Sequence, residues 1–296
     1  MNGDFGARLT KTFRGRSAGV RRVYHTWRRV ERFFKDSDRR SALQRLPQTN
    51  LRIEHDLGFH VVPPGVFGET DDIVREARQA LASFDATTPP AGKNRKRFLQ
   101  NVLDASTLTR ESAPVRFALR DDVLAAVSDY LRIVPFLTSI QVFHSDTVEG
   151  VPTSSQLYHC DGDDVTQIKV FVYCSDVDVA SGPLTVLDAA ATTQVQRSTR
   201  YWYRSRLTDE QVDAVVGAGH DHPILGPSGT AAFVDTSRCF HFGSRVAPGA
   251  PARLVTMIQY QTPYSFMVPS SAQATLPFRR FLGPGLNRLQ RQVLGE

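Results

Sequence analysis

Short apolar runs separated by turn residues dominate the second half of this chain. Six of them lie at residues 137–144, 166–174, 183–187, 229–234, 238–242 and 252–261. Runs of this length and spacing predict β-strands, and many short strands are typical of a β-sandwich or a double-sheet barrel. We therefore expect a mainly β core over about residues 136–262, flanked by helices.

The first half has a different pattern. Apolar residues at helical spacing predict helices over 71–84 and 121–131, and residues 58–62 predict a strand. The segment 188–228 interrupts the strands and lacks their alternation. Within it, Thr208 and Gln211 match a capping box that begins a helix. A loop of this length in a compact β domain is usually a lid or a functional insertion.

Positive charge is concentrated at the start of the chain. The whole chain has a net charge of +6. Residues 1–46 contain 13 Lys/Arg and 4 Asp/Glu, a net of +9, so residues 47–296 carry 6 − 9 = −3. We predict a basic leader over 1–46 and a single domain over 47–296. The acidic body argues against nucleic acid as a partner.

Residues 17–35 predict one amphipathic helix within this leader. Its apolar residues recur at spacings of three and four, and its arginines fall mostly elsewhere. One interpretation is peripheral contact with an anionic lipid surface or an acidic partner. The other is a helix that packs on the body and leaves its arginines in solvent.

The cysteines and the hydropathy pattern indicate the compartment. Cys160, Cys174 and Cys239 form no CxxC pair and predict neither a disulfide framework nor a zinc site. No apolar run approaches the roughly 18 residues of a membrane span. We expect a cytoplasmic protein, with membrane association through residues 17–35 as the alternative.

Three pairs of residues, each containing at least one histidine, are alternative candidates for metal ligands. His159-Cys160-Asp161 precedes a predicted strand, and alternate residues of an extended chain point to one side. His144-Ser145-Asp146 has the same spacing, and about 0.8 such triplets arise by chance in this composition. His220 and His222 lie in the 188–228 insertion. Because the latter two pairs lie in polar surroundings, we favour His159 and Asp161.

Two later residues complete the candidate site. His241 lies in a short apolar run, where it is either a core residue or a third ligand. Arg253 shares one face of a predicted strand with Val255 and Met257. This alternation points the arginine into an apolar interior, where it needs an anionic partner, unless it lies at a solvent-facing edge.

These residues together resemble the phytanoyl-CoA dioxygenase-like family of Fe(II)/2-oxoglutarate oxygenases. The resemblance covers Ser155–Asp161, Ile168–Asp178 with Ser181–Leu184, Phe233–His241 and Arg253–Tyr260. It implies a double-stranded β-helix, that is, a cupin-like jelly roll. It also implies iron ligands His159, Asp161 and His241, with Arg253 binding the distal carboxylate of 2-oxoglutarate.

The implied reaction is hydroxylation of a small-molecule substrate with release of succinate and CO₂. A carboxylate at Asp161 favours hydroxylation, because related halogenases have a small residue there. Lys169 and Gln141 are further candidates for contact with 2-oxoglutarate. Cys160 and Cys239 are expected to point away from the metal and to pack.

The substrate pocket is less defined by the sequence. We expect Tyr201, Trp202 and Tyr203 to shield it. Arginines suggest an anionic or lipid-linked substrate; they lie in a 93–97 patch and at Arg197, Arg200, Arg204 and Arg206. The alternatives to an enzyme are a catalytically silent jelly-roll binding protein and a peripheral-membrane adaptor.

Overall fold

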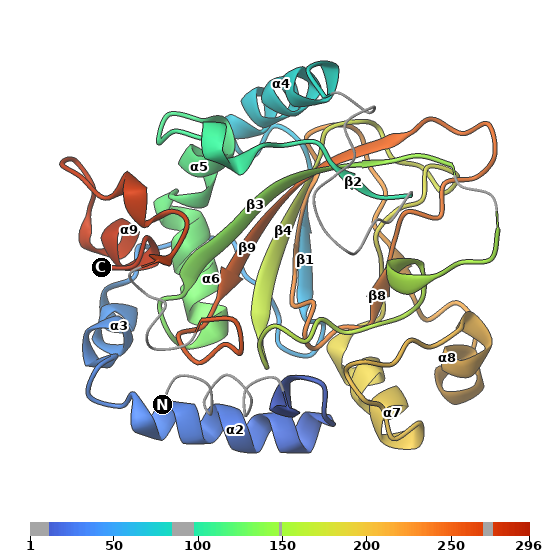
Figure 1. The fold of residues 1–296 in the computed structure, drawn as a ribbon, viewed down its shortest axis with the longest axis horizontal. Coiled ribbons are helices and arrows are strands. Elements are labelled where there is room, and N and C mark those ends of the chain that lie inside the picture. The colour runs from blue at the N-terminus through green and yellow to red at the C-terminus, as the bar shows by residue number, and fades with distance from the viewer. Residues whose placement is uncertain (1–11, 85–97, 148–149, 269–274) are drawn as a thin grey trace.

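The computed structural model describes residues 12–84, 98–147, 150–268 and 275–296 (Figure 1). The strands are β1 (Phe59–Val62), β2 (Gln100–Asn101), β3 (Phe136–Ser145), β4 (Gln167–Tyr173), β5 (Thr185–Val186), β6 (His222–Pro223), β7 (Ala231–Val234), β8 (His241–Phe242) and β9 (Arg253–Gln261). The α-helices are α2 (Ala18–Glu31), α3 (Ser37–Ser41), α4 (Glu69–Ala82), α5 (Ala113–Ala118), α6 (Asp121–Leu131), α7 (Ala189–Ser198), α8 (Asp209–Val216) and α9 (Arg288–Val293).

Two antiparallel sheets form the core. The larger sheet has the strand order β1-β7-β4-β9-β3-β2, and the smaller has the order β6-β5-β8. Strands far apart in the sequence are neighbours, as a jelly roll requires. The predicted jelly-roll core flanked by helices is therefore confirmed. Figure 1 shows α4, α5 and α6 on one side of the large sheet and β8 on the other.

Side-chain alternation gives the large sheet two different faces. On β4, Ile168, Val170 and Val172 join the core cluster shared with α4 to α6. The intervening Lys169, Phe171 and Tyr173 point into a pocket on the opposite face. β9 divides in the same way, with Leu254 and Ile258 in the core and Arg253, Val255 and Met257 at the pocket. Because successive side chains of a strand alternate, one set packs the fold and the other builds the pocket.

The helices predicted at 71–84 and 121–131 correspond to α4 and α6. The 188–228 segment differs from the predicted loop, because α7, α8 and the short strand β6 occupy about half of it. The predicted capping box is present at Thr208 and Gln211. α7 has few large apolar residues, so its sequence lacks the periodicity that would have revealed it.

Helix α2 packs on the body through its arginines. Arg21, Arg28 and Arg32 are buried with Tyr24, and Arg21 is 1% exposed. The expectation that these arginines would remain in solvent is therefore wrong. The outward side carries the apolar residues instead, with Val30 71% and Phe34 86% exposed. No described helix is long and apolar enough to cross a membrane.

Specific acceptors compensate these buried guanidinium groups. Arg21 donates to the carbonyls of Gly162 and Asp164 and lies over the ring of Tyr203, 3.7 Å from its centroid. Arg32 makes a bidentate pair with Asp36 at 2.7 and 2.8 Å. A buried guanidinium is costly unless it is paired, so these contacts fix which side of α2 faces inward.

His25 lies in the same interface, 3.8 Å from Asp164. Burial, aided by Arg29 and Arg21, lowers the pKa of His25 to about 4. Burial also raises the pKa of Asp164 to about 7, against the effect of its hydrogen bonds from Thr262 and Val165. At neutral pH the imidazole is therefore neutral, and the two groups do not form an ion pair.

This environment predicts a pH-dependent contribution of His25 to stability. Between about pH 6.5 and 4 the unfolded state binds a proton that the folded state excludes, so His25 costs stability as the pH falls. Relative to wild type, His25→Phe should gain on the order of 2–3 kcal/mol in unfolding free energy across this window. Urea unfolding at several pH values measures the difference, with the exposed His220→Phe as control. If the difference in unfolding free energy between wild type and His25→Phe did not vary with pH, the assignment would be wrong.

Candidate metal and cosubstrate site

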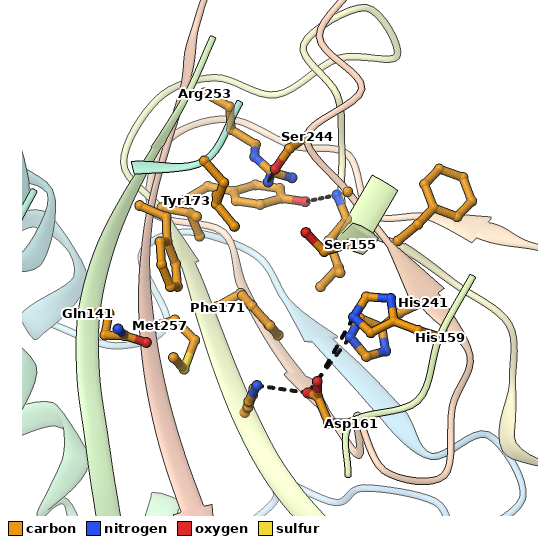
Figure 2. A pocket seen from close by; sticks show the side chains of 17 residues that line it. Gln141, Ser155, His159, Asp161, Phe171, Tyr173, His241, Ser244, Arg253 and Met257 are labelled. Carbon is orange, nitrogen blue, oxygen red and sulfur yellow. Dashed lines mark hydrogen bonds and ion pairs between the residues drawn. The ribbon is translucent and has the colours of Figure 1, made fainter. Parts of the chain in front are cut away.

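An isolated β-bridge joins the two segments that carry the candidate histidines. His159 and His241 exchange both backbone hydrogen bonds, at 3.1 and 3.0 Å. The backbone N–H of Asp161 then donates to the carbonyl of Thr236 at 2.7 Å. The segments are 82 residues apart in the chain, and these bonds place the three side chains on one wall of the pocket (Figure 2).

The three side chains form a ligand set for a metal ion. One donor atom from each of His159, Asp161 and His241 lies within 4.8 Å of the others. The Nε2 atoms of the histidines lie 3.9 and 3.8 Å from the Asp161 oxygens. The Nδ1 atoms face the carbonyls of Leu157 and Cys239, at 2.9 and 3.1 Å. These carbonyls accept from Nδ1–H, which leaves each Nε2 lone pair directed into the site.

The electrostatics suit metal binding. Burial lowers the pKa of His159 well below its usual value, and it lowers that of His241 as well. Burial alone would raise the pKa of Asp161, but Lys169 and the two neighbouring histidines together outweigh it and the pKa is lowered. Two neutral imidazoles and one carboxylate are the donor set of non-haem Fe(II) sites with open positions.

Lys169 lies beside Asp161 rather than free in the pocket. Its Nζ is 2.7 Å from Oδ2 of Asp161, and both side chains are less than one-fifth exposed. Burial lowers the pKa of Lys169, but the charges of Asp161 and Asp163 and the hydrogen bond to Asp161 together exceed this effect, and the pKa is raised. Lys169 therefore orients the carboxylate and supplies one positive charge to the site.

Arg253 forms the opposite end of the pocket (Figure 2). It is 5% exposed, so the solvent-facing alternative is wrong. One guanidinium nitrogen donates to the carbonyl of Gly182 at 2.6 Å, and another to Oγ of Ser244 at 2.9 Å. Its Nε is buried without a hydrogen-bond partner. No carboxylate of the described residues pairs with this guanidinium, so a buried cation faces the pocket without a counter-ion.

The sequence did not identify the residues that hold Arg253. Ser145 lies opposite Arg253 on the paired strand β3, and its Oγ is 2.9 Å from that of Ser244. Ser244 has a positive φ of 63°. Gly182, within the Ser181–Leu184 stretch of the resemblance, has φ 65°, and a Cβ there would lie 2.7 Å from the backbone nitrogens of Arg245 and Val246. Only the fold reveals that these residues converge.

Gln141 also lies at the pocket, on β3 beside Met257 of β9. Much of the remaining wall is apolar: Leu99, Phe143, Phe171, Leu184, Phe242, Val255 and Met257. Cys160 and Cys239 lie in hydrophobic clusters outside the pocket lining, as the alternation predicted.

The competing histidine pairs do not converge on this site. His144 pairs with Leu254 and Gln100 across the sheet, away from the pocket lining. His220 and His222 are exposed near the end of the 188–228 segment, after α8. Within the described ranges, only the triad brings three potential ligands together.

Two expectations about the substrate pocket are not met. Tyr201 and Tyr203 are buried in a separate cluster with Tyr158 and Phe240, so they do not shield the pocket. Four insertion arginines are exposed and lie outside its lining: Arg197, Arg200, Arg204 and Arg206. The 93–97 basic patch lies outside the described residues.

Known proteins resemble this chain in fold. No protein-family model matches it, and no curated protein matches it by sequence. The apo crystal structure of EctD from S. alaskensis has a TM-score of 0.53 at 15% identity, covering 73% of this chain and 80% of EctD. EctD with 2-oxoglutarate and 5-hydroxyectoine gives a TM-score of 0.51 at 14% identity, covering 73% and 79%. These similarities show that the chain shares its fold with EctD.

A third similar structure has a lower score. The non-heme alpha ketoglutarate dependent epimerase SnoN from nogalamycin biosynthesis has a TM-score of 0.47 at 20% identity, covering 75% of this chain and 83% of SnoN.

The close packing of Gly182 beside Arg253 and its neighbours predicts that a substitution at Gly182 reduces stability. Gly182→Ala should cost about 2 kcal/mol or more of unfolding free energy, because a positive φ and a backbone clash act together. Gly65→Ala is the matched control, since Gly65 has φ 82° but open space around its Cβ. It should cost only about 1 kcal/mol. Equal losses in chemical denaturation would show that the close approach at Gly182 is unimportant.

Proposed function

We propose that this protein is an Fe(II)- and 2-oxoglutarate-dependent dioxygenase that hydroxylates a small molecule. The observation that carries the proposal is one pocket with the His159–Asp161–His241 triad at one end and the unpaired guanidinium of Arg253 at the other (Figure 2). The fold shared with EctD, whose structure contains 2-oxoglutarate, supports it.

The side chains fit these cofactors. His159, Asp161 and His241 would hold Fe(II), and three ligands on one face leave positions open for a cosubstrate. Arg253 would bind the distal carboxylate of 2-oxoglutarate, where a planar guanidinium gives a charge-assisted pair. The bound iron and 2-oxoglutarate would supply the oxidising chemistry with O₂ as the oxidant: one oxygen atom would enter the substrate as a hydroxyl, the other would enter succinate, and CO₂ would be released.

The chain's own residues bind, orient and shield. Lys169 holds Oδ2 of Asp161, which leaves Oδ1 directed toward His159. The carbonyl of Gly182 and the hydroxyl of Ser244 fix the guanidinium of Arg253 before any ligand arrives. Phe171, Val255 and Met257 line the pocket and exclude water, which strengthens the pairing of opposite charges. Gln141 is a further polar contact for the cosubstrate.

The substrate proposal follows from the apolar lining of the pocket. Its apolar side chains favour a molecule with an apolar portion, of which a lipid-linked compound is one class. An anionic substrate stays a prediction that the pocket lining does not test, because the four insertion arginines that suggested it lie outside this lining. Membership of the phytanoyl-CoA dioxygenase-like family rests on the sequence motifs. A cytoplasmic location is supported by three cysteines that are free and buried.

The first test concerns the metal triad. Wild-type protein should convert 2-oxoglutarate to succinate only with Fe(II), and Asp161→Ala should reduce this turnover by about 100-fold or more. The matched control is Asp146→Ala, which changes the other His-x-Asp triplet and should retain activity. Full activity in Asp161→Ala would disprove the assignment. Metal and 2-oxoglutarate binding without turnover would favour the silent binding protein.

The second test concerns Arg253. Removing a charge-assisted pair costs about 1.5–3 kcal/mol, so Arg253→Gln should raise KM for 2-oxoglutarate roughly 10- to 100-fold. Arg253→Lys keeps the charge but loses the planar guanidinium, so its KM for 2-oxoglutarate should lie between those of wild type and Arg253→Gln. Thermal unfolding of each variant separates lost binding from lost folding. An unchanged KM in folded Arg253→Gln would show that 2-oxoglutarate binds elsewhere.

A further inference from the structure

Helix α2 presents an apolar stripe to solvent. Val20, Val23, Trp27 and Val30 of α2 recur every three or four residues, Phe34 follows in the turn after the helix, and all five are exposed. Phe33 widens the stripe at its C-terminal end. Figure 1 shows α2 along the edge of the molecule opposite α4. A helix of 14 residues is about 21 Å long, so this is an extended surface rather than a scattered set of side chains.

The body fixes this orientation. Rotation of α2 to bury its stripe would withdraw Arg21 from the carbonyls of Gly162 and Asp164. It would also withdraw Tyr24 from the ring of Phe266, with which it stacks at a centroid distance of 4.8 Å. A helix usually buries its apolar face, and α2 instead buries cationic groups that have specific partners. The outward stripe is therefore left for a partner outside the described chain.

The aromatic residues of this surface suit a lipid interface. The chain has two tryptophans, Trp27 and Trp202, and they are 54% and 47% exposed. Arg16 lies one turn before Val20, and its guanidinium is 5.1 Å from the ring centroid of Trp202. Trp202 therefore lies near the segment that precedes the N-terminal end of α2. Tryptophan is enriched where hydrocarbon meets lipid headgroups, because its ring is apolar with one polar edge.

The exposed charges favour an anionic partner. Arg22, Arg29, Lys35 and Glu31 are the exposed charged residues over 18–35, a net of 3 − 1 = +2. Arg16 adds to this at the N-terminal end. A second copy of the chain would bring two such basic surfaces together, which is electrostatically unfavourable. Basic residues beside an apolar helical face match the requirements for binding anionic lipid headgroups.

We propose that the apolar stripe of α2, with Trp202, docks the protein peripherally on an anionic membrane surface. Valine, phenylalanine and tryptophan side chains enter the boundary between headgroups and acyl chains. Arg22 and Arg29 pair with lipid phosphates. The body remains outside the bilayer, because its contacts with α2 use the opposite, arginine-bearing side.

Vesicle co-sedimentation of the full chain tests this proposal. Wild type should pellet with vesicles of phosphatidylcholine plus phosphatidylglycerol and not with phosphatidylcholine alone. Val23→Gln with Val30→Gln should weaken binding roughly tenfold or more, because each valine contributes apolar burial. The control is Val151→Gln with Val179→Gln, which changes two equally exposed valines elsewhere and should leave binding unchanged. Arg22→Gln with Arg29→Gln should lose the preference for anionic vesicles.

Several outcomes would overturn the proposal. The first is that wild type does not bind anionic vesicles. The second is that the Val23→Gln, Val30→Gln variant binds as well as its control variant. Light scattering supplies a third, since a wild-type dimer that the stripe variant abolishes would identify a second copy as the occupant. Because none of these measurements involves 2-oxoglutarate turnover, their result is independent of the proposed function. Blue-shifted tryptophan emission on vesicle addition reports contact directly.

Discussion

The bridge between His159 and His241 is the contact on which the site depends. Its two backbone hydrogen bonds bring together segments that the chain separates by most of the jelly roll. Because the bridge is antiparallel, both imidazoles leave the backbone toward the same side, and their ring centroids are 4.3 Å apart. Asp161 then needs only one further hydrogen bond, to Thr236, to complete the ligand set. The site is therefore a product of strand pairing and not of a mobile loop.

The large sheet gives this site its surroundings through one regularity. Where β3, β4 and β9 pass the pocket, residues such as Val142, Val170 and Ile258 contribute to the helix-covered core, and their sequence neighbours Gln141, Phe171 and Met257 line the pocket. Cross-strand register then assigns neighbours: Met257 lies between Gln141 and Phe171, and Val255 lies between Phe143 and Tyr173. A shift of one residue in β9 would exchange Arg253 with a core residue, so correct register and a functional pocket are the same requirement.

The sequence predicted those parts of the structure that follow from periodicity. Alternation predicted the strands, the inward direction of Arg253 and the outward packing of Cys160. It did not predict Ser244 beside Arg253, because that contact depends on a turn and on strand pairing over a long separation. Periodicity also identified the two faces of α2 but not which face packs. The packed face is set by backbone carbonyls of the body that accept hydrogen bonds from Arg21, and a hydrophobic pattern carries no information about such acceptors.

The contact of Arg21 with the carbonyls of Gly162 and Asp164 links two parts of the chain that composition treats as separate. These carbonyls belong to the segment that begins at Asp161, one of the three candidate ligands. A shortened chain that starts after residue 46 would leave these acceptors facing water and would remove a constraint on the carboxylate. The basic leader in this respect supports the segment that carries one of the candidate ligands.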